Sequence, residues 1–124
     1  MRIVRFGEGA DGTCHASEVE ITYAADAATG LAMSESLTSD GMQFVTLPDG
    51  FAAGLHPSAK RRVLVVLRGQ IEVGVPDGSS RVFGPGDSFI VDDAATSGHT
   101  TRTIGGAVEM LWVAIPDTAV WRSV

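Results

Sequence analysis

The chain has 124 residues, which is enough for one compact domain with its own hydrophobic core. Hydrophobic residues make up 44% of the sequence and charged residues 19%, a balance that excludes an intrinsically disordered segment. The formal net charge of −6 argues against a general electrostatic attraction to nucleic acid or to an anionic membrane.

The N-terminal sequence and the cysteine content bear on the cellular compartment. The sequence shows neither the charged-then-apolar pattern of a signal peptide nor an apolar run long enough to span a membrane. The single cysteine, Cys14, cannot form an intramolecular disulfide and cannot build a cysteine-based zinc site alone. We therefore expect a cytoplasmic protein, with neither nucleic acid nor membrane as partner, in which Cys14 is a buried or loop residue.

The apolar segments are short, and fifteen glycines and five prolines separate them, as is typical of strands joined by turns. In chain order, the patterns indicate strands over residues 2–6, 19–23, 42–47, 63–67, 71–75, 81–83, 88–91 and 107–115. The intervening region 24–41 is compatible with a helical turn, a loop or an edge strand. Strands at this spacing with little helix predict an all-β sandwich or barrel.

Two of the predicted strands differ in their burial pattern. Residues 63–67 are continuously apolar, which predicts a strand covered on both faces and ended by a turn at Gly69. Further along, Ile71, Val73 and Val75 alternate with polar or small residues. This alternation predicts one buried face and one solvent-exposed face.

Two motifs built on glycine and histidine flank the hairpin formed by the predicted strands 71–75 and 81–83. In the first, His56 follows Gly50 after five residues, and Gly69 comes thirteen residues after His56. The second begins with the turn at 85–87 (Pro-Gly-Asp) and ends at His99. In their order and separation, the two motifs resemble those of the cupin family of small β-barrels.

This resemblance implies the fold and the oligomeric state. It implies a single domain over residues 1–124 with the cupin double-stranded β-helix or jelly-roll barrel, motif 1 at about 50–69 and motif 2 at about 84–103. Cupins commonly form dimers, and the apolar strands 2–6 and 63–67 fit this arrangement. We therefore expect a homodimer.

The metal-binding positions of the cupin motifs are degenerate in this chain. Many cupins bind Fe, Mn, Zn or Ni through three histidines and one carboxylate, but here Ser58 falls on the second histidine and Arg62 on the glutamate. A neutral hydroxyl is a poor ligand for such metals, and a guanidinium places a fixed positive charge beside the dication. We expect no cofactor; if a divalent metal is bound, its ligands are His56 and His99.

The same motifs supply the candidate catalytic residues. We expect His56 and His99 to line the cavity as acid and base, with Arg62 as the third catalytic residue. A one-residue change of register would turn Arg61 inward instead. A buried guanidinium needs an intramolecular carboxylate or an anionic ligand. The candidate intramolecular partners are Glu109, Asp92 and Asp93.

Other side chains are expected to bind the substrate or to line the cavity. The predicted substrate-binding residues are Ser58, Gln43, Thr46, Thr101, Met110 and Trp112. An additional apolar lining is expected from Met33, Met42, Phe44 and Phe89, for which plain core packing is the alternative interpretation.

Three functions follow from this set of residues. The first is a metal-independent enzyme (an isomerase, cyclase or lyase) that catalyses acid–base chemistry on a small acidic or enolisable molecule. The second is a metal-dependent cupin oxygenase with a two-histidine site. The third is a non-catalytic protein that binds a small molecule. The sequence favours the first, because it retains two imidazoles but lacks the remaining metal ligands.

Overall fold

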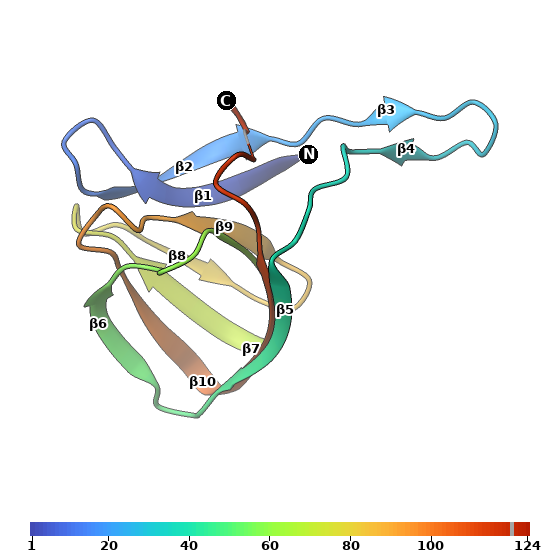
Figure 1. Ribbon diagram of the computed structural model, residues 1–124. Helices are drawn as coiled ribbons and strands as arrows, with labels where there is room; N and C mark the ends of the chain where they lie inside the picture. Colours follow the sequence, from blue (N-terminus) through green and yellow to red (C-terminus); the bar gives the residue numbers. More distant parts are fainter. Residues whose placement is uncertain (120) are drawn as a thin grey trace.

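The computed structural model describes residues 1–119 and 121–124, and every regular element among them is a β-strand (Figure 1). The strands are β1 (Arg2–Glu8), β2 (Cys14–Glu20), β3 (Ala24–Ala25), β4 (Ala32–Met33), β5 (Gly41–Leu47), β6 (Ala52–His56), β7 (Arg62–Gly74), β8 (Ser80–Phe83), β9 (Ser88–Asp92), β10 (His99–Ala114) and β11 (Arg122–Ser123). No helix able to cross a membrane occurs in this described part of the chain.

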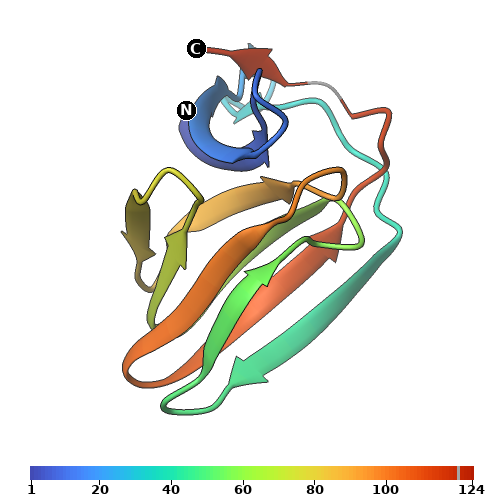
Figure 2. The ribbon, with the colours of Figure 1, turned by 90° about the vertical axis from the view of Figure 1, so that its left-hand side faces the viewer.

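Nine of the strands form one sheet that curls around a common interior (Figure 2). Its order is β11-β2-β1-β9-β7-β10-β5, with β6 paired to β10 and β8 paired to β7. The long strands β7 and β10 connect the parts of the sheet, because each pairs with different strands at its two ends. β7 pairs with β9 and then with β8, and β10 pairs with β6 and then with β5. The all-β jelly-roll prediction is thereby confirmed.

The sequence predicted that a strand would end at Gly69. Instead, β7 continues through this residue as one 13-residue strand. Gly69 has a positive φ of 80°, and a Cβ atom built on it would lie 2.4 Å from the carbonyl oxygen of Ala107. Glycine is therefore required here because it allows both the left-handed backbone and the close approach of β10.

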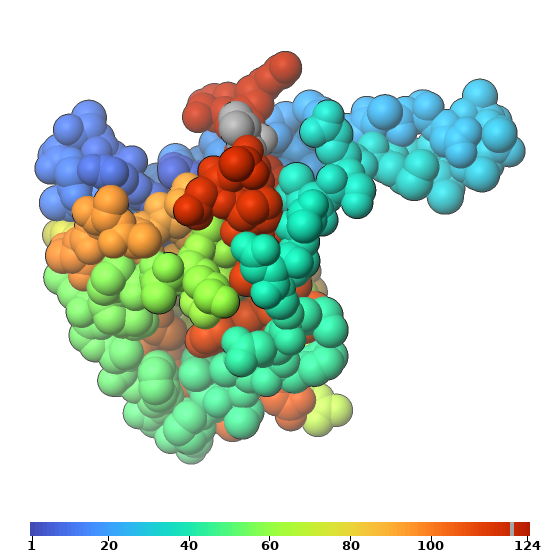
Figure 3. Space-filling model, viewed as in Figure 1, coloured from blue at the N-terminus to red at the C-terminus, as the bar shows by residue number. Residues whose placement is uncertain are grey.

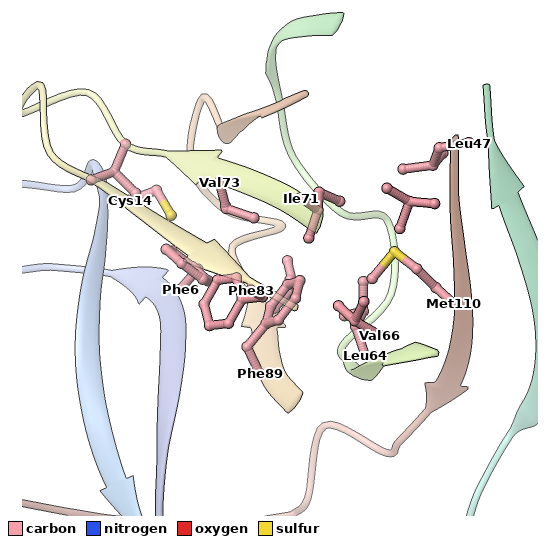
Figure 4. Close-up of a cluster of buried hydrophobic side chains, with 13 residues drawn as sticks. Phe6, Cys14, Leu47, Leu64, Val66, Ile71, Val73, Phe83, Phe89 and Met110 are labelled. Atoms are coloured by element: carbon pink, nitrogen blue, oxygen red, sulfur yellow. The ribbon is translucent and has the colours of Figure 1, made fainter. Parts of the chain in front are cut away.

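The hydrophobic core lies inside the curled sheet (Figure 4). Phe6 contacts Phe89 edge to face at 5.7 Å between ring centroids, and Phe83 stacks on Phe89 at 4.3 Å. Ile71 and Val73 of β7 are buried as the alternating pattern predicted. The aromatic cluster fills one part of the interior, and the remaining space forms a cavity.

The outer face of the sheet differs from the prediction. Leu64 and Val66 of β7 are buried inside the barrel, and Val63 on the opposite face packs against the buried cluster of Ile3, Val19 and Ile90. Leu67 is 42% exposed, so only the first part of this strand is covered on both faces. On β5, Met42 and Phe44 also point outward, and Phe44 is 74% exposed. The prediction that Met42 and Phe44 line the cavity is therefore wrong, because the register with β10 turns both side chains to the outer face.

The region 21–40 extends away from the barrel as an arm (Figure 3). It carries the two-stranded β3–β4 hairpin, which is separate from the main sheet, and its remaining residues form turns and loops. Of the three predicted possibilities, the region is therefore mainly a loop, and the helical turn is wrong. Met33 lies on this arm, 53% exposed, and does not line the cavity. The predicted strand at 19–23 is shifted, since β2 covers Cys14–Glu20. The homodimer stays a prediction.

Candidate functional site

The interior cavity has a volume of about 220 Å³ and opens beside the loop that follows β6. Most of its wall is apolar: Leu47, Phe51, Pro57, Ala59, Leu64, Ile71, Val73, Phe89, Val91, Met110 and Trp112. The polar side chains in the wall are His56, Ser58, Arg62, His99 and Thr101. The cavity therefore combines an apolar body with a small polar group at one side, the composition typical of a small-molecule site.

The two predicted histidines lie next to each other in this wall. His56 is the last residue of β6 and His99 is the first residue of β10, and the two are paired across the strands. Their ring centroids are 4.7 Å apart, with 50° between the ring planes. His99 is 7% exposed, whereas His56 is exposed to solvent, so the pair extends from the interior to the cavity mouth.

Gly98 makes this juxtaposition sterically feasible. Its φ is +96°, and a Cβ atom on it would lie 2.0 Å from the carbonyl carbon of His56. The chain thus approaches the His56–Pro57 peptide as closely as only glycine permits. The role of Gly98 in positioning the two imidazoles was not predicted from the sequence.

A buried carboxylate fixes the orientation of His99. Asp93 is 1% exposed; its Oδ2 lies 2.5 Å from Nδ1 of His99, and its Oδ1 accepts the backbone N–H of Ser58 at 2.8 Å. Burial by itself raises the pKa of Asp93, but the hydrogen bonds from His99 and Ser58 outweigh it, and the net pKa is lowered. An ionised Asp93 accepts the Nδ1 proton of His99, which leaves Nε2 as the free basic nitrogen.

The loop between β9 and β10 holds Asp93 in place. Thr96 donates its backbone N–H and its hydroxyl to the carbonyl of Asp93, each at 2.9 Å, and Gly98 donates to the Thr96 hydroxyl at 2.9 Å. Asp93 was predicted only as a partner for Arg62. An acidic residue six positions before a histidine carries no motif signal, so its true partner was not predictable.

Cys14 lies on the far side of Asp93. The residue is fully buried, and burial, followed by the charge of Asp93 and a hydrogen bond to it, raises the pKa of the thiol to about 12. A thiol with such a pKa stays protonated and is a poor nucleophile at neutral pH. Cys14 is therefore a buried, unreactive residue, as predicted.

His56 is held by the backbone. Its Nδ1 lies 2.7 Å from the carbonyl oxygen of Gly54, and because a carbonyl only accepts, this nitrogen carries the proton. The free nitrogen of His56 is therefore Nε2, as in His99. Both imidazoles thus have the same tautomer, fixed in one by a backbone carbonyl and in the other by a carboxylate.

Arg62, and not Arg61, faces the cavity. Its Nη1 donates to Oγ of Ser58 at 2.9 Å, and its guanidinium carbon lies 5.2 Å from the ring centroid of Trp112. Arg61 points to the other face of the sheet, where its Nε lies 3.2 Å from Asp92 and its Nη1 donates to the carbonyls of Asp117 and Ala119. The structure thus decides between the two registers.

No carboxylate is paired with Arg62 among the described residues. The three candidate partners are engaged elsewhere: Asp92 with Arg5 at 2.9 Å, Asp93 with His99, and Glu109 with Arg68 at 3.8 Å. The alternative of an intramolecular carboxylate partner is therefore wrong, because these carboxylates lie on other faces or behind His99. The side chain of Arg62 is partly exposed, and the anionic ligand stays a prediction.

The hydroxyl of Ser58 accepts a hydrogen bond from Arg62. Ser58 Oγ donates to the carbonyl oxygen of Lys60 at 2.5 Å and accepts from Arg62, while its backbone N–H is bonded to Asp93. With its only hydroxyl proton donated to Lys60, Ser58 has no side-chain donor left for a substrate. The geometry thus makes Ser58 a positioning residue that connects Arg62 to the Asp93–His99 pair.

The remaining predicted residues divide between the inner and outer faces of the sheet. Thr101, Met110 and Trp112 line the cavity, and Met110 is fully buried. Gln43 is exposed and lies with Arg62 and Trp112 around a second pocket of about 200 Å³ that adjoins the main cavity. Thr46 is exposed and paired with outward-facing Glu109, so it does not line the cavity. Alternation along β5 turns Thr46 outward because the neighbouring Leu47 points inward.

The donor set does not fit a cupin metal site. His56 and His99 offer two imidazole nitrogens, but the Ser58 hydroxyl is already engaged and the Arg62 guanidinium stands at the carboxylate position. No group of three His, Cys, Asp or Glu side chains able to hold a metal ion occurs in residues 1–119 and 121–124. The residues present therefore do not complete the three-histidine, one-carboxylate set.

A curled jelly-roll sheet with paired histidines at the mouth of its cavity defines a cupin-type barrel, and comparison with solved structures agrees. The cupin domain of Schizosaccharomyces pombe Cnp3 has a TM-score of 0.51 and 17% identity, over 95% of this chain and 84% of that domain. At this identity the likeness establishes the fold alone. The chain therefore has the cupin fold, as its motifs predicted.

Two further solved structures are similar over different shares of the chain. A putative ethanolamine utilization protein Q from Salmonella typhimurium has a TM-score of 0.46 and 14% identity, over 94% of this chain and 96% of that protein. A conserved protein of unknown function from Streptococcus pyogenes has a TM-score of 0.49 and 19% identity, over 69% and 72%. No protein-family model matches the sequence, and no curated protein matches it.

Proposed function

We propose that this protein is a metal-independent acid–base enzyme that acts on a small acidic or enolisable molecule in the barrel cavity. The observation that carries the proposal is the buried Asp93–His99 pair, whose imidazole lines the cavity beside His56. A carboxylate that fixes the tautomer of an imidazole is a recurrent arrangement for a general base. Isomerisation, cyclisation and dehydration all require such a proton transfer.

The three catalytic residues have distinct roles. His99 removes the proton through Nε2, because Asp93 holds its Nδ1 proton and stabilises the imidazolium that forms. His56, at the mouth, takes up a proton from solvent on Nε2 and delivers it to the product or to the leaving group, while the proton held by His99 is released to solvent. Arg62 binds the anionic group and stabilises the negative charge that develops when the proton leaves.

The structure also supports the proposal through its electrostatics. The cavity wall contains one permanent cation, Arg62, and no carboxylate, in a chain whose net charge is −6. An apolar wall lowers the effective dielectric constant and strengthens the interaction between Arg62 and a developing anion. This asymmetry favours an anionic intermediate over a cationic one.

The proposal is tested by solvent-deuterium exchange. Purified protein is incubated in D2O with enolisable 2-oxo acids such as 2-oxobutanoate and phenylpyruvate, and loss of the carbon-bound proton is followed by NMR. We expect accelerated exchange that His99→Gln and Asp93→Asn each reduce by about 10²-fold or more. Exchange at the wild-type rate in both variants, with circular dichroism showing intact folds, would refute the mechanism.

The two alternatives make different predictions in the same experiments. A metal-dependent oxygenase requires close to one metal ion per chain when untagged protein is purified from metal-replete cells. We expect elemental analysis to find far less. A non-catalytic binding protein would bind the oxo acids without accelerating exchange, in the wild type as in the His99→Gln variant.

A further inference from the structure

We propose that the ligand of this cavity is a monocarboxylate with an apolar body, whose carboxylate is anchored by Arg62 while its reacting carbon faces the histidines. This inference rests on the proposed function for the identity of the reacting end. The anchor itself is argued from the binding geometry, and its test requires no turnover.

Arg62 is preorganised but only partly bonded. Ser58 accepts one of its N–H groups at 2.9 Å, and the Trp112 ring lies beneath the guanidinium at 5.2 Å. Stacking on an aromatic face leaves the edge of the guanidinium plane, with its remaining N–H donors, available to an acceptor. A carboxylate matches this edge because it accepts two parallel hydrogen bonds.

The charged side chains around Arg62 do not neutralise its guanidinium, which leaves a ligand to supply the negative charge. Among the described residues, no Asp or Glu oxygen lies within salt-bridge distance of its guanidinium. Asp93, the nearest carboxylate to the catalytic pair, directs its oxygens to His99 and to the Ser58 N–H. Arg62 is thus a cation in a mostly apolar wall, and an anion supplied from solution neutralises it.

The cavity wall accommodates a ligand with one carboxylate but not a ligand with two. Away from Arg62, the two histidines, Ser58 and Thr101, the cavity is bounded by apolar side chains such as Ile71, Val73, Phe89 and Met110, none of which offers a side-chain hydrogen-bond donor of useful strength. A second carboxylate against this surface would lose its hydration without compensation. The apolar wall therefore selects a monocarboxylate over a dicarboxylate, and Arg62 selects it over an amine.

The volume limits the size of the body. At about 220 Å³, the cavity is smaller than the pockets of roughly 300–1,000 Å³ that hold drug-sized ligands. A ring or short chain of about six carbons is a suitable probe for this space. Cyclohexanecarboxylate carries such a body, one carboxylate and no group that the histidines can transform.

The test is a titration of the full chain with cyclohexanecarboxylate, followed by ¹H–¹⁵N NMR with the indole N–H of Trp112 as reporter. The comparison ligands are the neutral carboxamide, cyclohexylmethylamine and cyclohexane-1,4-dicarboxylate. We expect each to bind at least about tenfold more weakly than the monocarboxylate, since a charged hydrogen-bonded anchor contributes about 10- to 100-fold in affinity. Equal binding of the carboxamide would overturn the inference.

Two arginine variants isolate the anchor. Arg62→Met is expected to weaken carboxylate binding by about 10- to 100-fold, and Arg62→Lys by less, because lysine keeps the charge but not the paired donors. The matched control is Arg68→Met, which removes the same charge from a side chain that is 79% exposed and lies outside the cavity wall. If Arg62→Met and Arg68→Met, both folded by circular dichroism, had equal effects, the anchor would be wrong.

The His99→Gln variant separates this inference from the proposed function. We expect it to bind cyclohexanecarboxylate within about threefold of the wild type, while its deuterium exchange is lost. Weak carboxylate binding by the wild type, together with His99-dependent exchange on neutral ketones, would overturn the anchor but leave the acid–base mechanism intact. Tight carboxylate binding without any His99-dependent exchange would overturn the acid–base mechanism but leave the anchor intact.

Discussion

The carboxylate of Asp93 lies 2.5 Å from Nδ1 of His99, and its second oxygen accepts the backbone N–H of Ser58 at 2.8 Å. The pair therefore connects three segments: the loop after β9, the first residue of β10, and the loop between β6 and β7 that includes Ser58. Because Ser58 also accepts from Arg62, the orientation of the guanidinium is coupled to that of the base. This network makes the site testable by single substitutions.

Replacing Asp93 is expected to change how stability depends on pH. The folded-state pKa of Asp93 is lowered from its ordinary value of 3.8, so its stabilising contribution is present above about pH 3.8 and is lost as the pH falls further. Asp93→Asn should cost about 3 kcal/mol at pH 7 in urea unfolding. The difference from wild type should shrink at pH 3; a difference independent of pH would contradict the ionised state of Asp93.

The thiol of Cys14 is expected to resist modification. Its pKa is raised from 9.0 to about 12, chiefly by burial, so the contribution of the protonated thiol to stability is present below pH 9.0 and is lost as the pH rises toward 12. A disulfide reagent such as 5,5′-dithiobis(2-nitrobenzoate) should label Cys14 at pH 8 only after urea unfolding. Rapid labelling of the folded protein would show that Asp93 is accessible from the Cys14 side.

Gly98→Ala is expected to disturb the histidine pair. The new Cβ would lie 2.0 Å from the His56 carbonyl carbon, so the strand start must move and destabilise the fold by more than the roughly 1 kcal/mol of φ strain alone. Gly78→Ala is the matched control, because Gly78 has a similar φ of +91° with nothing within 4 Å. Equal losses of stability in thermal unfolding would show that the close approach to His56 is unimportant.

The same substitution is expected to cost more stability at Arg61 than at the neighbouring Arg62. Arg61→Met removes the ion pair to Asp92 and the hydrogen bonds to Asp117 and Ala119, which should cost about 2 to 3 kcal/mol. Arg62→Met removes one hydrogen bond and should cost about 1 kcal/mol. Urea unfolding of both variants measures the difference, and a larger cost for Arg62→Met would indicate that its role is structural.

Much of the fold could be predicted because its signals are local. Glycine–histidine spacing, turn residues and the alternation of Ile71 and Val73 all depend on a few neighbouring residues. The same signals led to His56, His99 and Arg62 as candidates for the cavity. Strand β6 was missed because its alanines and glycine have weak intrinsic strand preference, and the first part of β10 because its residues show no clear alternation of apolar and polar side chains.

The placement of individual side chains could not be predicted, because it depends on register. A shift of one residue exchanges the two faces of a strand, and so Thr46, Met42 and Phe44 were assigned to the cavity although they point outward. The hydrogen bond from the backbone of Ser58 to Asp93 was unpredictable for a related reason. Ser58 and Asp93 are 35 residues apart in sequence, and only the packing of their loops brings them together.

The amino-acid sequence thus determined that the chain is all-β, that it has the cupin motif spacing, and that it retains two imidazoles with an arginine in place of a metal-binding carboxylate. Only the tertiary structure decided that Arg62 faces inward, that no carboxylate pairs with it among the described residues, and that a buried Asp93 orients His99. The physical reason is that residue identity and spacing are local properties, whereas pairing and burial arise when distant strands meet.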